Sequence, residues 1–358
     1  MSSLLQRRRL QLGGHMAALD ISCSKTAPPT PPTSARRLCS SDTEVSVATS
    51  PNDDLDILDI LGQGTTSMVH RCHRKRDNLQ VALKVWRTID PEEIAIAEEE
   101  FRLLRSLNHP NIIGVLDFYQ LPGKVFTILE FFEGCELGQA VLQAAEGRFS
   151  EIQSMRLSKA LFSAVQYLHD QDVLHRDIKP ENVRVDKSLS TLKLLDFNTS
   201  RRIRENAALT PTGTQLYAAP EVLLGESPAK EADVWGAGLC TYWMLTGELP
   251  QGRKVAGRCS ARKAALRPIE FCGEKWQLIS CQCKDVLASS LALTPFARAD
   301  AEAILALGWF QHDGVQDVGP LDGSVISAKN SREVTCQGQE ELPEWQPHQQ
   351  TQQQTQQQ

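Results

Sequence analysis

The chain has 358 residues, of which 41% are hydrophobic and 23% are charged. These fractions are typical of a folded protein and exclude a wholly disordered, collagen-like or membrane-embedded chain. The longest stretch of the apolar part without a charged residue, 234–247, is too short to cross a bilayer as a helix. The formal net charge of −6 gives no general attraction to nucleic acid or anionic membranes. We therefore expect no nucleic acid partner and no membrane span.

The ten cysteines are scattered and too few for a disulfide scaffold, which favours a reducing compartment. The first residues lack the apolar core of a secretory signal, so we expect a cytoplasmic protein. The same residues are rich in arginine, and no acidic residue precedes Asp20. Organellar targeting by this N-terminal segment therefore stays open.

The aromatic residues divide the chain into one folded unit and two tails. Residues 1–53 contain no Phe, Tyr or Trp. In 313–358 the only aromatic residue is Trp345, and this segment ends in a glutamine-rich run. Such segments bury too little apolar surface to offset the entropy lost on ordering, so both tails are predicted to be disordered. The predicted domain is 54–312.

In chain order, the domain begins with short β-like runs, among them 81–85 and 125–129. One helix is predicted between these runs, because Asp90 fits an N-cap and Pro91 the first helical position. A later helix is predicted from apolar residues at helical spacing, namely Leu157, Leu161, Ala164, Val165 and Leu168. The pattern predicts a small β-rich lobe followed by a larger helical lobe.

A glycine-containing turn follows the first β-like run of the domain. Gly62, Gly64 and Ser67 are small enough for a backbone turn to approach phosphate oxygens closely. Lys84, on a later run, adds a positive charge that phosphates favour. Taken alone, the glycine pattern fits an ordinary hairpin equally well.

Glu100 lies on the predicted helix that begins after Asp90. It shares a face with Ile96, Leu103 and Leu104. A carboxylate on an apolar stripe is expected to have a buried partner, and Lys84 is the available cation. The alternative, that the acidic run 98–100 is a solvated face, fits the first two residues of the run.

The second half of the domain contains an ordered series of short motifs. These are His175-Arg-Asp-Ile-Lys-Pro-Glu-Asn182, Leu192-Lys-Leu-Leu-Asp-Phe-Asn198, Ala219-Pro-Glu221 and Asp233-Val-Trp-Gly-Ala-Gly238. The series resembles the signatures of the eukaryotic protein kinases, and the resemblance covers roughly 260 residues. It implies an α+β, two-lobed protein kinase fold with a small β-rich N-lobe carrying one helix and a large, mainly helical C-lobe. The sequence around Trp276 looks like that of the calcium/calmodulin-dependent kinase group.

The resemblance implies ATP and Mg²⁺ as cofactors and a catalytic set of Asp177, Lys179, Asn182 and Lys84. Asp177 would accept or orient the proton of the attacking hydroxyl, and Lys179 would neutralise the γ-phosphate. Asn182 and Asp196 would hold the metal through oxygen atoms. Phosphoryl transfer independently requires a base, metal ligands and a phosphate-binding cation, and all of them are present.

The segment 128–137 resembles the kinase hinge, with Leu129 as gatekeeper. Backbone groups of Glu130 and Phe132 would bind adenine, and the Glu136 carboxylate would reach the ribose. The predicted nucleotide site comprises Gly62, Gly64, Ser67, Val69, Ala82, Lys84, Glu100, Glu130, Phe132, Glu136 and Asp196.

The expected partner is a protein substrate, because Lys179 together with Thr214 resembles the pattern of serine/threonine-specific members. The resemblance also places Thr210 where an upstream activating kinase phosphorylates related chains. Arg176 and Arg201 would bind the resulting phosphate. The alternative is that Thr210 is a solvated turn residue.

Three residues depart from the family pattern, of which Ser67, a small residue in place of the third glycine of the loop, disturbs it least. Asn198 replaces the glycine of the Asp-Phe-Gly motif, and we expect it to adopt the positive φ that asparagine tolerates. Arg184 stands where relatives have Leu or Met beneath adenine, and we expect its stem to pack there with the guanidinium turned outward. Two hypotheses follow: a Mg²⁺- and ATP-dependent serine/threonine kinase, or a pseudokinase that acts as a kinase-shaped interaction scaffold. The complete charged set favours the kinase.

Overall fold

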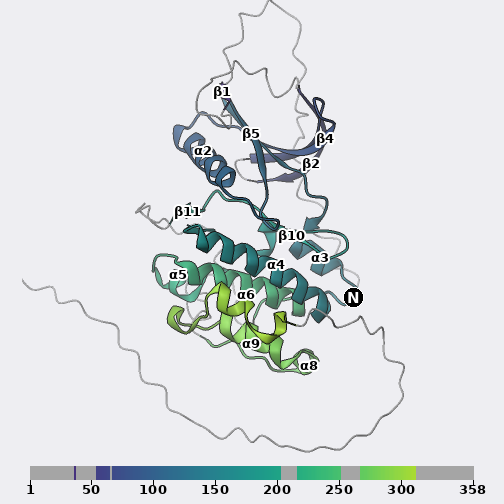
Figure 1. The fold of residues 1–358 in the computed structure, drawn as a ribbon, viewed down its shortest axis with the longest axis vertical. Helices are drawn as coiled ribbons and strands as arrows, with labels where there is room; N and C mark the ends of the chain where they lie inside the picture. Colours follow the sequence, from purple (N-terminus) through teal and green to yellow (C-terminus); the bar gives the residue numbers. More distant parts are fainter. Residues whose placement is uncertain (1–35, 38–53, 65–66, 203–215, 251–266, 312–358) are drawn as a thin grey trace, which may run out of the picture. The chain divides into compact units, whose positions relative to one another are not determined.

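The structure is a computed structural model that describes residues 36–37, 54–64, 67–202, 216–250 and 267–311. The predicted two-lobed α+β fold is confirmed within these residues (Figure 1). The predicted disordered tails, apart from 36–37, lie outside the described residues, as does Thr210.

The N-lobe contains an antiparallel sheet of six strands in the order β1-β5-β6-β4-β3-β2. The strands are β1 (Arg36–Arg37), β2 (Leu55–Gln63), β3 (Ser67–Arg74), β4 (Leu79–Trp86), β5 (Val115–Leu121) and β6 (Lys124–Glu130). In this sheet Lys84 on β4 lies opposite Val69 on β3 and Thr127 on β6. The register therefore places Lys84 beside Val69 of the predicted nucleotide site.

Helix α2 (Pro91–Ser106) is the predicted helix of the N-lobe and packs against β5 and β6. Asp90 caps it by accepting a hydrogen bond of 2.9 Å from the Glu92 amide, as the sequence predicts. Its buried face carries Glu100, Leu103 and Leu104. A carboxylate is thus held inside the apolar face that attaches α2 to the sheet.

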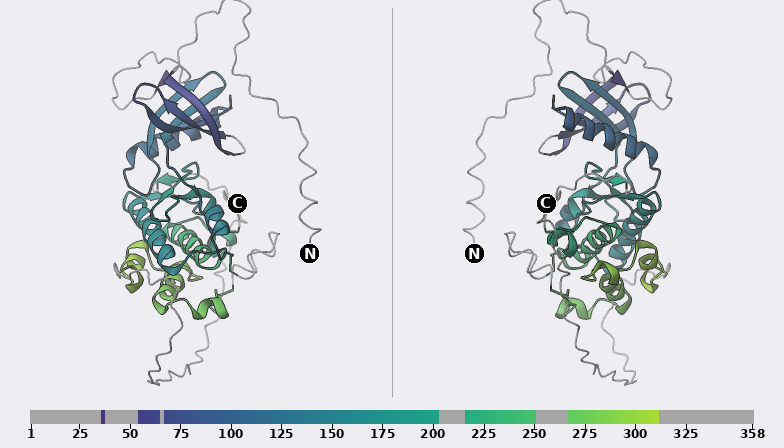
Figure 2. Two further views of the ribbon diagram at one scale, coloured as in Figure 1. Left: turned by 90° about the vertical axis from the view of Figure 1, so that its right-hand side faces the viewer. Right: turned by 90° about the vertical axis from the view of Figure 1, so that its left-hand side faces the viewer.

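The C-lobe is mainly helical and forms the other end of the domain (Figures 1 and 2). Its α-helices among the described residues are α3 (Leu137–Gln143), α4 (Glu151–Asp170), α5 (Pro220–Leu224), α6 (Lys230–Thr246), α8 (Glu274–Gln277), α9 (Cys281–Ser290) and α10 (Ala301–Leu305). A capping box formed by Ser150 and Gln153 begins α4, and all the apolar residues predicted for this helix are fully buried.

In its described part the C-lobe also contains two small sheets of short strands. The strands β7 (Cys135–Glu136), β9 (Val183–Val185) and β10 (Leu192–Leu194) form a sheet in the order β10-β9-β7. A second sheet pairs β8 (Val173–Leu174) with β11 (Arg201–Arg202). Three of the predicted catalytic residues, Asp177, Lys179 and Asn182, lie on the loop between β8 and β9, which includes the 3₁₀-helix Pro180–Asn182. None of the described helices combines the length and the apolar character that a transmembrane helix needs.

The contact between α6 and α9 depends on the absence of a side chain at Gly238. A Cβ atom there would lie 2.6 Å from the Ser290 Oγ and 2.9 Å from the Leu291 Cδ2. We predict that Gly238→Ala lowers the free energy of unfolding by about 1–3 kcal/mol, measured by urea denaturation, because the helices must separate. Gly308→Ala is the control, since its Cβ would have 3.8 Å of space to the nearest atom. Equal stability of the two variants would contradict this account of the packing.

Candidate active site

One cavity of about 290 Å³ contains the whole predicted nucleotide site. Every residue of that predicted set lines it, and so does Asn182. The cavity is also lined by Ile113, Leu195 and Glu181, which the sequence patterns did not predict for the nucleotide site. Leu195 directly precedes Asp196, so its place in the motif was the available signal. The structure therefore brings together residues that are spread over more than half of the domain.

A buried ion pair joins β4 to α2 inside this cavity. The Lys84 Nζ lies 2.8 Å and 2.9 Å from the two Glu100 carboxylate oxygens, and the side chains are 8% and 4% exposed. The pairing is the one expected from the sequence. The backbone amide of Phe197 also donates to Glu100, at 3.2 Å, so the same carboxylate holds the segment that contains Asp196.

The ionisation of Glu100 reflects two opposing effects. Complete burial raises the pKa of its carboxyl group above the ordinary value of 4.5, and the ammonium of Lys84 offsets part of this rise. Because the charged form depends on Lys84, loss of that cation would leave an uncompensated buried charge.

A second buried carboxylate, Asp233 on α6, holds the catalytic loop. It accepts hydrogen bonds of 2.8 Å from the backbone amides of His175 and Arg176, and its Oδ2 lies 3.1 Å from the His169 Nε2. Burial tends to raise the pKa of Asp233, but the interactions with the His169 and His175 side chains and the hydrogen bond from the Arg176 amide hold it below its ordinary value. The backbone just before Asp177 is therefore fixed to the C-lobe core.

The predicted catalytic residues Asp177, Lys179 and Asn182 contact one another. The Lys179 Nζ lies 2.6 Å from the Asp177 Oδ2. The Asn182 Nδ2 donates to the same oxygen at 3.0 Å and to the Asp177 carbonyl at 2.8 Å. These contacts orient the Asp177 carboxylate and engage Oδ2, so Oδ1 is the oxygen that can accept a proton from a hydroxyl group.

Asp196 and Asn182 provide a donor set that fits Mg²⁺. The Asp196 Oδ1 is buried and has no hydrogen-bond donor among the described residues. It lies 3.6 Å from the Lys84 Nζ. Asn182 uses its Nδ2 for the Asp177 contacts, which leaves its oxygen as an acceptor. Carboxylate and amide oxygens are ligands that Mg²⁺ takes in proteins.

The expectation of a positive φ at Asn198 is wrong. Asp196 has the positive φ, at 58°, whereas Asn198 is not among the described residues with this conformation. The Asn198 side chain instead accepts a hydrogen bond of 3.0 Å from the Lys84 Nζ. An asparagine fits here because the backbone does not require the conformational freedom of glycine.

The expectation that the Arg184 guanidinium turns outward is also wrong. Its Nη2 donates a hydrogen bond to the carbonyl oxygen of Gly134, and its Nε is buried without an acceptor among the described residues. Burial accordingly lowers the pKa of Arg184, an effect that Cys135 and Glu136 partly oppose. The side chain reaches the backbone after the hinge because β9, which carries it, pairs directly with β7.

The predicted hinge residues differ in the backbone groups that they offer. The Glu130 amide donates to the Gly114 carbonyl at 2.9 Å, and the Gly114 amide donates back to the Glu130 carboxylate at 2.9 Å. Lys193 forms an ion pair with that carboxylate. The Glu130 amide is therefore used within the fold, and Phe132 is the predicted residue whose amide can bind adenine.

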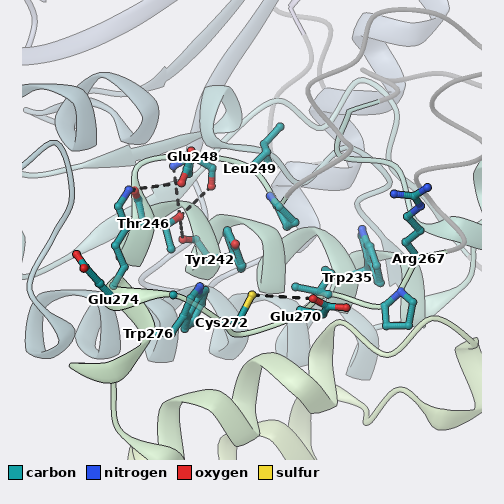
Figure 3. A pocket seen from close by; sticks show the side chains of 15 residues that line it. Trp235, Tyr242, Thr246, Glu248, Leu249, Arg267, Glu270, Cys272, Glu274 and Trp276 are labelled. Carbon is teal, nitrogen blue, oxygen red and sulfur yellow. Dashed lines mark hydrogen bonds and ion pairs between the residues drawn. The ribbon is translucent and has the colours of Figure 1, made fainter.

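A larger cavity of about 610 Å³ lies in the C-lobe (Figure 3). Among the described residues it is lined by aromatic side chains, including Trp235, Tyr242 and Trp276, and by acidic side chains such as Glu270. None of the predicted catalytic or nucleotide-binding residues lines it. Its size alone therefore does not make it the active site.

The protein kinase domain family model matches residues 55–310, and the chain belongs to the protein kinase family. It is 31% identical over 262 residues to human calcium/calmodulin-dependent protein kinase type IV, a match that covers 72% of this chain and 54% of the relative. It is 29% identical over 296 residues to a putative ribosomal protein S6 kinase alpha-2 of Caenorhabditis elegans, covering 77% of this chain and 38% of the relative. The chain thus spans about half, or less, of the length of these relatives. Their names agree with the resemblance to serine/threonine kinases near the calcium/calmodulin-dependent group.

The Lys84–Glu100 pair gives a pH-dependent prediction for stability. Lys84→Met should lower the free energy of unfolding by about 3–5 kcal/mol near neutral pH, because Glu100 remains buried without its cation. A carboxyl group whose pKa is raised in the folded state stabilises the fold below its unfolded value and loses this contribution as the pH rises through the folded pKa. The loss in the variant should therefore grow as the pH rises above 4.5.

Urea unfolding at about pH 5 and about pH 8 measures this dependence. The double variant Lys84→Met/Glu100→Gln is the control, because it has no carboxyl group at this position to titrate. A loss of stability in Lys84→Met that is the same at both pH values would contradict the assignment to Glu100.

Proposed function

We propose that the chain is a serine/threonine protein kinase that transfers the γ-phosphoryl group of ATP to hydroxyl groups of protein substrates. The observation that carries the proposal is the assembly of a base, two cations and two metal-ligand side chains around one cavity and its adjoining loop. These residues are Asp177, Lys84, Lys179, Asn182 and Asp196. Catalysis of phosphoryl transfer consists mainly of such positioning and charge neutralisation.

In this proposal Asp177 accepts the proton of the attacking hydroxyl through its Oδ1. The neighbouring Lys179, 2.6 Å from the other oxygen, is placed to neutralise charge on the transferred phosphoryl group. Asn182 holds the Asp177 carboxylate in orientation through its Nδ2. The acceptor hydroxyl is therefore recognised next to a carboxylate whose rotation is restricted.

Asn182 and Asp196 would hold Mg²⁺ through their side-chain oxygens. The metal, when bound, neutralises and orients the phosphates of the nucleotide. Lys84 contributes a second positive charge from the N-lobe, held by Glu100. The residues that bind the phosphates therefore come from both lobes.

The purine would lie between apolar side chains, with Val69 and Ala82 on one side, and the Phe132 amide would bind its edge. Glu136 is placed to accept a hydrogen bond from the ribose. Burial and the nearby Glu181 raise the pKa of Glu136, and the cation of Arg184 partly offsets that rise. Arg184 thus contributes to keeping the ribose-binding carboxylate charged.

The proposal predicts that Asp177→Asn abolishes phosphoryl transfer while the fold is retained, because the side chain loses its proton acceptor at nearly constant volume. The expected loss is about 10²- to 10⁴-fold. The measurement is transfer of labelled phosphate from ATP to a generic serine/threonine acceptor by the full chain in Mg²⁺. Asp170→Asn is the matched control, since Asp170 is exposed at the end of α4. Equal transfer by parent and Asp177→Asn would refute the role of Asp177.

The alternative function is a pseudokinase that serves as an interaction scaffold. Arg184 favours it, because a half-buried cation beneath the purine is costly to desolvate and replaces an apolar surface. The kinase is preferred because every charged residue that the transfer needs is retained. No phosphoryl transfer by the parent with any acceptor would favour the scaffold.

We also propose that an upstream kinase activates the chain at Thr210, which lies outside the described residues. Two cations support this regulation. The Arg176 Nε is buried without an acceptor among the described residues, and burial together with nearby Arg201 lowers the pKa of Arg176. A bound phosphate would satisfy this donor and offset the repulsion between the two arginines.

Thr210→Ala should therefore lower activity more than the control Thr212→Ala, because only the first removes the hydroxyl that we assign to phosphorylation. Kinase assays before and after phosphatase treatment measure the effect, and treatment should lower the activity of the parent. Full activity of a preparation in which mass spectrometry finds Thr210 unmodified would contradict the switch.

A further inference from the structure

The ammonium group of Lys84 uses all of its hydrogen-bonding capacity within the protein. A lysine ammonium has three N–H donors. Three oxygens lie within 3.0 Å of the Lys84 Nζ: two from Glu100, at 2.8 Å and 2.9 Å, and the Asn198 Oδ1 at 3.0 Å. The Asp196 Oδ1 is more distant, at 3.6 Å. A phosphate oxygen can therefore bind this ammonium only if one of the three near oxygens gives way.

Asn198 is the partner that can leave at the lowest cost. Glu100 is charged, 4% exposed and fixed by the Phe197 amide as well as by Lys84. Asn198 is neutral, lines the same cavity and accepts from Lys84 through its side chain alone. Hydrogen bonds in which both partners are charged are stronger than those to a neutral amide. A phosphate will therefore displace the amide oxygen before it displaces the carboxylate.

We propose that Asn198 is a positioning residue that competes with the nucleotide phosphates for Lys84. Its amide oxygen holds the third N–H of the ammonium until a phosphate takes that place. The inference rests on the proposed function for the identity of the ligand, a nucleotide bound in this cavity. A glycine at this position has no side chain and could not compete, so the competition is a property of this particular residue.

The competition has two opposite consequences. Without nucleotide, the Asn198 amide stabilises the Lys84–Glu100 pair, because it satisfies a buried donor. With nucleotide, the same contact must be broken, so it weakens the binding of the phosphates but not that of the nucleoside. A residue with a purely structural role would lower both stability and affinity when it is removed.

The test is calorimetric titration of the full chain and its Asn198→Ala variant with ADP and with adenosine, in metal-free buffer. We expect ADP to bind about fivefold more tightly to the variant, which corresponds to about 1 kcal/mol. Adenosine should bind equally to both proteins, because it has no phosphate. The unfolding temperature of the variant without nucleotide should be lower than that of the parent, since Lys84 has lost one acceptor.

Asn198→Asp is the second variant, which keeps the size of the side chain and adds a negative charge. It should bind ADP more weakly than the parent, because the carboxylate holds Lys84 more strongly and repels the phosphates. Adenosine binding should again be unchanged, which shows that the cavity is intact.

Equal or weaker binding of ADP by Asn198→Ala in metal-free buffer would overturn the competition, even if the proposed kinase activity is found. A repeat in Mg²⁺ distinguishes a second role: ADP binding that is unchanged in metal-free buffer but weaker in Mg²⁺ for the variant would overturn the competition and assign Asn198 to the metal instead. Failure of the parent and of Asn198→Ala to bind either ligand would instead refute the proposed nucleotide site, and with it this inference.

Discussion

The buried ion pair between Lys84 and Glu100 is the interaction on which the site depends. It ties a central strand of the N-lobe sheet to α2, and through the Phe197 amide it also holds the segment that carries Asp196. Neither charge is stable at this depth without the other. The pair therefore fixes the relative positions of the sheet, the helix and Asp196, a proposed metal ligand. Because each buried charge is costly without its partner, the two side chains must meet in this arrangement.

Asp233 has the same function for the C-lobe half of the site. It is buried on α6 and accepts hydrogen bonds from the backbone amides of His175 and Arg176, which precede the proposed base Asp177. A carboxylate with several directed donors restricts a loop more strongly than apolar packing can, because each hydrogen bond has a preferred angle. The two buried carboxylates thus hold the proposed phosphate-binding and proton-accepting parts of the site from opposite lobes.

The sequence predicted the fold, and all the residues that it predicted for the nucleotide site line one cavity, but it did not predict every lining residue or every contact. Glu100 could be assigned because an acidic residue on an apolar helix face needs a partner and few cations were available. The conformation of Asn198 and the direction of Arg184 were predicted wrongly, because each depends on a neighbour that is distant in sequence: Lys84 for Asn198 and Gly134 for Arg184. Local propensity describes the backbone that a residue tolerates, whereas side-chain hydrogen bonds are decided by the tertiary structure.

Thermal unfolding of the full chain with ATP, in the presence and absence of Mg²⁺, tests the central claim most directly. A ligand that binds the folded state raises the unfolding temperature, and the rise grows with affinity. The account predicts that ATP stabilises the protein and that Mg²⁺ increases the effect, because the side-chain oxygens of Asn182 and Asp196, which line the cavity, would bind the metal together with the phosphates. No stabilisation by ATP at any Mg²⁺ concentration would contradict the assignment of this cavity as a site of phosphoryl transfer.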